Sequence, residues 1–121
     1  MSRVVHFEVP ADDVARAQAF YGKAFGWQFQ AWDGPMDYTF AITGTEGRGI
    51  DGAIIPRQAP GTGTVNTIDV PSLDRAIQAV EKAGGRIAVP KMAIPGIGWL
   101  AYGLDTEGNM FGMMEGDEKA R

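Results

Sequence analysis

The residue types best suited to chemistry in this sequence are a single histidine and a carboxylate close to it. His6 is the only histidine in the 121-residue chain, and its near-neutral pKa suits a base, a hydrogen-bond donor or a metal ligand. Glu8 follows two residues later, so both side chains lie on one face of an extended strand, about 7 Å apart. The structural alternatives are a histidine bonded to the backbone and a solvated Glu8, or Glu8 paired with Arg57 or Lys91.

The elements that must position this pair are a strand and a helix at the start of the chain. Alternating residues over 4–9 predict a strand that has His6 and Glu8 on its mixed face. Pro10 is expected to end this strand, and Asp12 or Asp13 to cap the helix that follows. Gly26 is expected to close that helix in a left-handed conformation.

The chain then repeats the pattern of strand, helix and three strands. Val9-Pro10 recurs as Val70-Pro71, and Gln18-Ala19 recurs as Gln78-Ala79. The repeat predicts an α+β fold of two tandem βαβββ modules, which form a curved mixed sheet around a concave site. Further strands are expected at 27–31, 37–43, 50–55, 64–70, 86–89, 99–104 and 109–115, with a helix capped by Ser72 and a loop at 91–98.

The predicted boundaries place module one at 1–57, a Pro/Gly-rich linker at 58–63 and module two at 64–115, within one compact domain. A charged tail over residues 116–121 is expected to fray. We also expect that dimerisation completes the concave site, which makes a homodimer the predicted assembly.

Composition excludes several classes of function. Eleven Lys and Arg residues stand against 15 Asp and Glu, a formal charge of −4, and no clustered basic patch suggests nucleic-acid binding. The chain has no cysteine, which removes disulfides, thiolate metal sites and cysteine nucleophiles. No apolar run approaches the roughly 20 residues of a membrane span, and no signal peptide is visible. A cytoplasmic location is the resulting expectation.

Two stretches give the chain a family resemblance. The sequence HFEVPADD…AFYGKAFGW near the start and DTEGNMFGMME near the end, within paired βαβββ modules, resemble the vicinal-oxygen-chelate superfamily. This superfamily contains glyoxalase I, bleomycin-resistance proteins and extradiol dioxygenases. The resemblance covers about residues 3–115, and is greatest to small glyoxalase-like members that carry a loop such as PKMAIPGIGWLAY.

The resemblance also implies where metal ligands would stand. The ligand on the first strand falls on His6, and its counterpart in module two falls on Thr67. The glutamate of the final strand falls on Gly112, and the fourth strand offers Ile54 and Ile55. One of the four family ligands is therefore present, whereas a catalytic metal site usually has at least three protein ligands. We predict no cofactor, with a divalent metal as the alternative.

Several other side chains are candidate ligand contacts. By the repeat, Asp69 is the counterpart of Glu8, and a shifted metal site would use His6, Glu8 and Asp69 together. Trp99 follows a Pro/Gly-rich loop and is the predicted stacking wall, although core packing is the common role of such aromatics. The predicted ligand-binding residues are His6, Glu8, Tyr38, Thr67, Asp69, Trp99 and Met114, and His6 and Glu8 are the catalytic candidates.

The predicted function follows from this departure from the family pattern. We expect a glyoxalase/bleomycin-resistance-like protein that binds a small, partly apolar molecule without the full metal site. One alternative is a divalent-metal-dependent lyase, isomerase or dioxygenase of the glyoxalase I type. The other is a dimeric protein that sequesters an antibiotic or metabolite without chemistry. Metal binding, or a pH-dependent turnover that is lost in His6→Ala, would indicate an enzyme. Tight binding without turnover, with an affinity that drops in Trp99→Ala, would indicate sequestration.

Overall fold

The computed structural model describes residues 2–121, which contain two helices and eight strands. They divide into two compact units: one is His6–Thr64, and the other is Val65–Arg121 together with residues 2–5. We keep the names module one and module two for the two βαβββ repeats, and the first three residues of the first strand, which begins at Arg3, fall in the second unit. No helix in residues 2–121 is long and apolar enough to cross a membrane.

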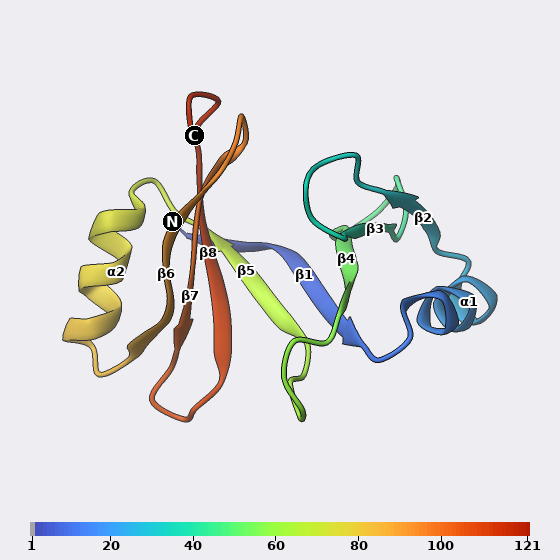
Figure 1. Ribbon diagram of the computed structural model, residues 1–121, viewed down its shortest axis with the longest axis horizontal. Coiled ribbons are helices and arrows are strands. Elements are labelled where there is room, and N and C mark those ends of the chain that lie inside the picture. The colour runs from blue at the N-terminus through green and yellow to red at the C-terminus, as the bar shows by residue number, and fades with distance from the viewer. Residues whose placement is uncertain (1) are drawn as a thin grey trace. The chain divides into compact units, whose positions relative to one another are not determined.

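Module one has the expected order of elements (Figure 1). Its sheet has the strand order β2-β3-β4-β1, in which β1 and β4 are parallel and the other pairs antiparallel. The elements are β1 (Arg3–Ala11), α1 (Val14–Phe25), β2 (Gln28–Ala31), β3 (Thr39–Ile42) and β4 (Gly52–Pro56).

Module two repeats this arrangement, with the order β5-β8-β7-β6 and β5 parallel to β8. Its elements are β5 (Val65–Asp69), α2 (Leu73–Lys82), β6 (Arg86–Ile94), β7 (Gly98–Leu104) and β8 (Met110–Gly116). The α+β class and the two βαβββ modules, each with a mixed sheet, are thus confirmed.

Both helices begin and end largely where local signals predict. The Asp13 side chain accepts the N–H of Arg16 at the start of α1, and Gly26 ends that helix at φ 77°. Ser72 caps α2 through the N–H of Arg75. These side chains satisfy N–H groups that the first helical turn leaves without an intrahelical acceptor.

The two helices differ in how deeply they are buried. In module two, a core of Val70, Leu73, Ala101 and Met113 lies between α2 and one face of its sheet. No residue of α1 is buried, and Phe20 and Phe25 on it are 58% and 66% exposed. The helix-covered face of module two is therefore the better packed of the two.

Strand register separates the two faces of the module-one sheet. A Cβ on Gly22 of α1 would lie 3.7 Å from the Phe29 ring, so α1 covers the face that carries Phe29. Along the ladder, Glu8 is aligned with Ala53 and Ala53 with Phe40. Because successive residues of a strand point to opposite faces, Glu8 and Phe40 lie on the face that α1 does not cover.

Pro10 does not end β1 as predicted. The strand runs on to Ala11, with Pro10 aligned with Ile55 of β4. Proline lacks an N–H donor, but its neighbours keep the ladder intact, since the Arg57 N–H donates to the Ala11 carbonyl at 2.9 Å. The proline therefore removes one donor without breaking the pairing.

The loop predicted at 91–98 is also wrong, because β6 extends from Arg86 to Ile94. Its pairing with β7 is irregular between Ile87 and Val89 and between Val89 and Met92. This strand lies at the edge of the module-two sheet, where proline and bulges are tolerated since one side has no partner strand. Pro90 thus reads locally as a strand end, but the pairing continues past it.

The tail is held in place instead of frayed. The Asp117 N–H donates to the Ile97 carbonyl at 2.9 Å, and the Gly96 N–H donates to the Ala120 carbonyl at 3.0 Å. Ala120 is only 2% exposed. The tail therefore packs back on the turn between β6 and β7, a contact that a charged sequence does not reveal.

Candidate functional site

The structure brings together three of the predicted site residues through one hydroxyl group. The Tyr38 hydroxyl lies 2.6 Å from His6 Nε2 and donates a hydrogen bond to Glu8 Oε2 at 2.9 Å. His6 and Glu8 come from β1, and Tyr38 directly precedes β3. The three side chains form a continuous hydrogen-bonded chain, which we call the His–Tyr–Glu network.

Burial determines the charge state of His6 in this network. Glu8 is 6% exposed, and His6 and Tyr38 are half-buried. Burial lowers the pKa of His6, and the nearby carboxylates of Glu8 and Asp51 oppose this by favouring the charged ring. Because burial is the larger effect, the pKa of His6 lies below its ordinary value of 6.5, and the imidazole is neutral at neutral pH.

Aromatic rings surround the shared hydroxyl. The Tyr38 ring meets Trp32 edge-on at 6.1 Å and Phe40 edge-on at 5.4 Å between centroids. The His6 ring lies nearly parallel to that of Tyr38, at 6.2 Å and 13°. These contacts fix the tyrosine ring and place apolar surface beside a polar centre.

The other predicted contacts belong to module two. Thr67 is buried and aligned with Gly112, whereas Asp69 is exposed and aligned with Met114. Tyr102 is also aligned with Gly112, so it shares the face of Thr67. This face lies opposite the one that α2 covers.

Trp99 does not share that face. It packs against the core beneath α2, and its Nε1 donates to Asp117 Oδ2 at 3.0 Å. The Lys91 ammonium lies 4.8 Å from the centroid of its ring. Trp99 thus packs against the core beneath α2 and bonds to the tail. Tyr102 is an aromatic residue on the open face of module two, the face that α2 does not cover.

The donor set of the family's metal site is not reproduced here. Among residues 2–121, no group of three or more His, Cys, Asp or Glu side chains is placed to hold a metal ion. At the position of the family glutamate, a Cβ on Gly112 would lie only 3.2 Å from Thr67 Oγ1 and 3.3 Å from the Tyr102 ring. A larger side chain would require its neighbours to shift, so the residues present do not fit a metal of the family type.

Sequence reasoning missed Phe40 and Asp51 as members of this region. Alternation over 37–43 put Tyr38 and Phe40 on one face, but could not show that this face meets His6. Asp51 stands just before β4, the strand that pairs with β1, and its carboxylate acts on His6 while it accepts the Thr43 N–H at 2.9 Å. Its place in the strand expected at 50–55 gave no signal of this role.

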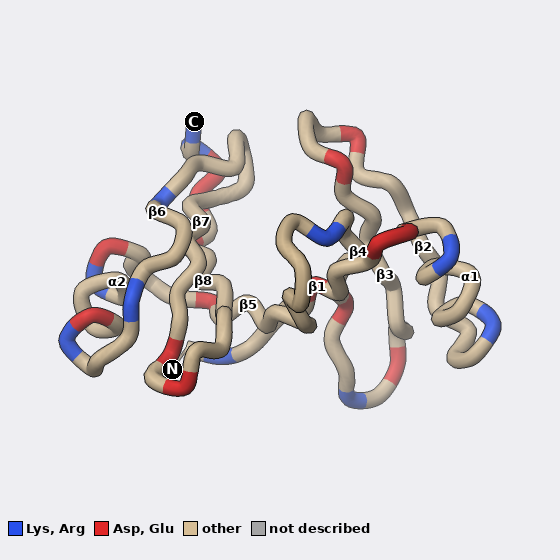
Figure 2. Tube along the Cα trace, turned by 60° about the horizontal axis from the view of Figure 1, so that its bottom comes forward, with Lys and Arg blue, Asp and Glu red and all other residues tan. Residues whose placement is uncertain are grey.

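Charged residues of both signs occur on both modules (Figure 2).

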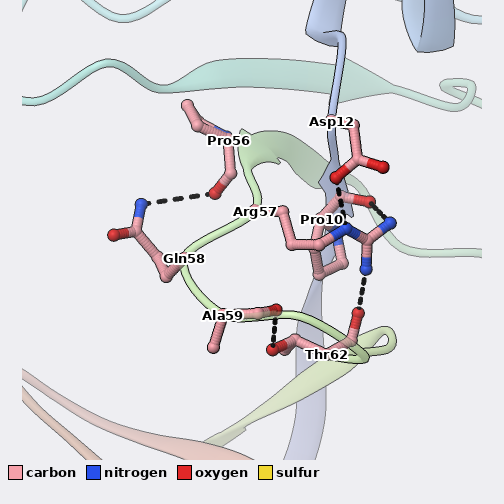
Figure 3. A network of polar contacts seen from close by, with 7 residues as sticks. All are labelled: Pro10, Asp12, Pro56, Arg57, Gln58, Ala59 and Thr62. Atoms are coloured by element: carbon pink, nitrogen blue, oxygen red, sulfur yellow. Dashed lines mark hydrogen bonds and ion pairs between the residues drawn. The ribbon is translucent and has the colours of Figure 1, made fainter.

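Arg57 forms several polar contacts that hold the linker (Figure 3). Arg57 Nε donates to Asp12 Oδ1 at 2.8 Å, while its other nitrogens donate to the carbonyls of Pro10 and Thr62. An open hollow of about 530 Å³ lies here, lined by Asp12, Arg57 and residues 58–61. A second hollow of about 170 Å³ is lined by residues 43–51. Neither hollow is lined by the His–Tyr–Glu network.

Solved structures define the class of this fold. A hypothetical protein from Bacillus halodurans matches 99% of this chain and 98% of its own, with a TM-score of 0.71 at 16% identity. A glyoxalase/bleomycin resistance protein/dioxygenase superfamily member from Vibrio splendidus matches 97% and 100%, with a TM-score of 0.67 at 18% identity. Methylmalonyl-CoA epimerase from Mycobacterium tuberculosis matches 94% and 87%, with a TM-score of 0.68 at 13% identity. These likenesses show a glyoxalase-type fold.

Sequence similarity narrows the assignment. Residues 3–44 match the family described as bleomycin resistance protein-like N-terminal. A glyoxylase-like domain-containing protein from Didymella fabae is 33% identical over 111 residues, which cover 84% of each chain. The chain therefore belongs to the family of glyoxylase-like domain-containing proteins.

Proposed function

We propose that this protein binds a small, partly apolar molecule against the open face of the module-one sheet, at the His–Tyr–Glu network. The network itself is the observation that supports this most directly. A buried carboxylate is retained in proteins where hydrogen bonds compensate for its desolvation. Glu8 has such a bond from Tyr38, and this arrangement presents a fixed polar centre between aromatic rings.

The composition of this face agrees with small-molecule sites in general. Such sites are mostly apolar, with a few polar groups that fix the orientation of the ligand. Trp32, Tyr38 and Phe40 supply the apolar surface, and His6 supplies a polar edge that is half exposed. Thr67, Asp69 and Met114 remain predicted contacts on module two.

The binding proposal is tested by a fragment screen followed by nuclear magnetic resonance. Small aromatic fragments should shift the resonances of His6, Tyr38 and Phe40 more than those of residues beneath α1. Tyr38→Phe should weaken binding severalfold. Tyr21→Phe is the matched control, since it removes a hydroxyl from the α1 side and should change nothing. Fragments that bind equally well to both variants, or that shift only other surfaces, would refute the proposal.

A second candidate function is proton transfer without a metal, and the same network favours it. A neutral imidazole linked through a hydroxyl to a carboxylate can accept a proton and relay charge to a buried acid. Exchange of ligand C–H protons in D₂O, followed by proton spectra of any fragment that binds, tests this activity. Exchange that is lost in His6→Gln would support an enzyme, whereas binding without exchange would leave the protein as a binding module.

A further inference from the structure

The hydrogen bonds of Tyr38 determine which nitrogen of His6 carries the proton. A tyrosine hydroxyl has one hydrogen, and an ionised carboxylate can only accept. The hydroxyl donates to Glu8 Oε2 at 2.9 Å, so its oxygen accepts in the 2.6 Å contact with His6 Nε2. His6 therefore carries its proton on Nε2. The neutral ring then has a lone pair on Nδ1, which makes Nδ1 a hydrogen-bond acceptor.

We propose that the ligand of this site is a molecule that donates a hydrogen bond to His6 Nδ1 from a hydroxyl or N–H group, and that carboxylates are rejected. This inference rests on the proposed binding function at the same face. It adds the chemical class of the ligand, which follows from the acceptor that the network leaves on the ring. A hydroxylated aromatic molecule satisfies both this acceptor and the aromatic surroundings.

The charged groups around His6 also disfavour a ligand that carries a carboxylate. The carboxylates of Glu8 and Asp51 are the charged groups that act on the ring. A ligand carboxylate would meet the repulsion of both and would face an imidazole nitrogen that has no proton to donate. A hydroxyl or N–H donor meets neither penalty, and the Tyr38 ring, which lies parallel to that of His6, gives its apolar part a surface to contact.

A single histidine makes the tautomer directly measurable. In untagged, ¹⁵N-labelled protein at pH 8, a long-range proton–nitrogen spectrum contains one imidazole. We expect a protonated Nε2 and an unprotonated Nδ1. A protonated Nδ1 at this pH would overturn the inference, whatever the protein binds. Tyr38→Phe should release the tautomer preference, and Tyr21→Phe should retain it.

The ligand class is tested with phenol, anisole and benzoate, followed through the His6 signals. Phenol and anisole share a ring and differ in the donor, so phenol should bind about fivefold more tightly, the factor expected for one net hydrogen bond. Benzoate should bind more weakly than either, and Tyr38→Phe should reduce the preference for phenol. Equal affinities for phenol and anisole, or tighter binding of benzoate, would overturn the donor inference alone. If none of the three shifts the His6 signals, both the inference and the proposed binding function fail.

Discussion

Removing one hydroxyl should destabilise module one through two hydrogen bonds at once. Tyr38→Phe keeps the ring and its contacts with Trp32 and Phe40, but removes the group that bonds to His6 and Glu8. A hydrogen bond to a charged group contributes about 1.5–3 kcal/mol and a neutral one about 1 kcal/mol. Because Tyr38 and His6 are only half-buried, water can replace part of this, and we expect a loss of about 2 kcal/mol in the free energy of unfolding.

Urea unfolding followed by tryptophan fluorescence measures this loss. For a small protein whose unfolding free energy falls by roughly 1–3 kcal/mol per molar urea, a loss of about 2 kcal/mol lowers the midpoint by about 1 M. Tyr21→Phe is the control. Tyr21 stacks on Trp27 with centroids 4.7 Å apart, and residues 2–121 show no hydrogen bond to its hydroxyl, so its midpoint should change little.

Two results would refute this reasoning. The first is a Tyr38→Phe midpoint that equals that of Tyr21→Phe, which would mean that the network contributes no stability. The second is an unchanged midpoint with a smaller urea slope, which would indicate a change in the unfolded state or a loss of two-state behaviour. Agreement between fluorescence and circular dichroism transitions distinguishes this second result from a true loss of stability.

Three further predictions follow from the same structure. Because the pKa of His6 is lowered in the folded protein, the unfolded chain binds the proton more tightly, and stability should fall as pH falls below 6.5. Between pH 7.5 and 5, the native protein should therefore lose more unfolding free energy than His6→Gln. A larger loss in His6→Gln, measured by urea titration, would contradict this. Gly22→Ala should stabilise α1 by about 1 kcal/mol, since a Cβ there meets only ordinary contacts. Gly26→Ala should destabilise it by about 1 kcal/mol, because Gly26 has φ 77°. Melting temperatures that shift in the same direction in both variants would refute these two predictions. Arg57→Met should lower the unfolding free energy by about 1–2 kcal/mol because it breaks three polar contacts in the linker. Asp12→Asn should lower it by under about 0.5 kcal/mol, since the ion pair is exposed. Equal unfolding free energies for the two variants would argue against a stabilising role of the Arg57 contacts.

The sequence by itself determined the features that depend on neighbours along the chain. The helix caps at Asp13 and Ser72 and the stop at Gly26 are short-range hydrogen-bonding and backbone preferences, and all three are confirmed. The repeat of the modules is likewise a pattern that can be counted. Alternation also sufficed to put His6 and Glu8 on one face, because a strand allows no other arrangement.

Only the tertiary structure decided what those side chains meet. Tyr38 is 30 residues from Glu8, and its hydroxyl reaches the carboxylate only because β3, β4 and β1 align in one register. The same dependence on pairing placed Trp99 beneath α2 and left Tyr102 on the open face. Strand order and register are set by the packing of distant segments, which local residue patterns do not specify. His6, Glu8 and Tyr38 were thus readable from the sequence as candidates, and the hydrogen bonds that join them were not.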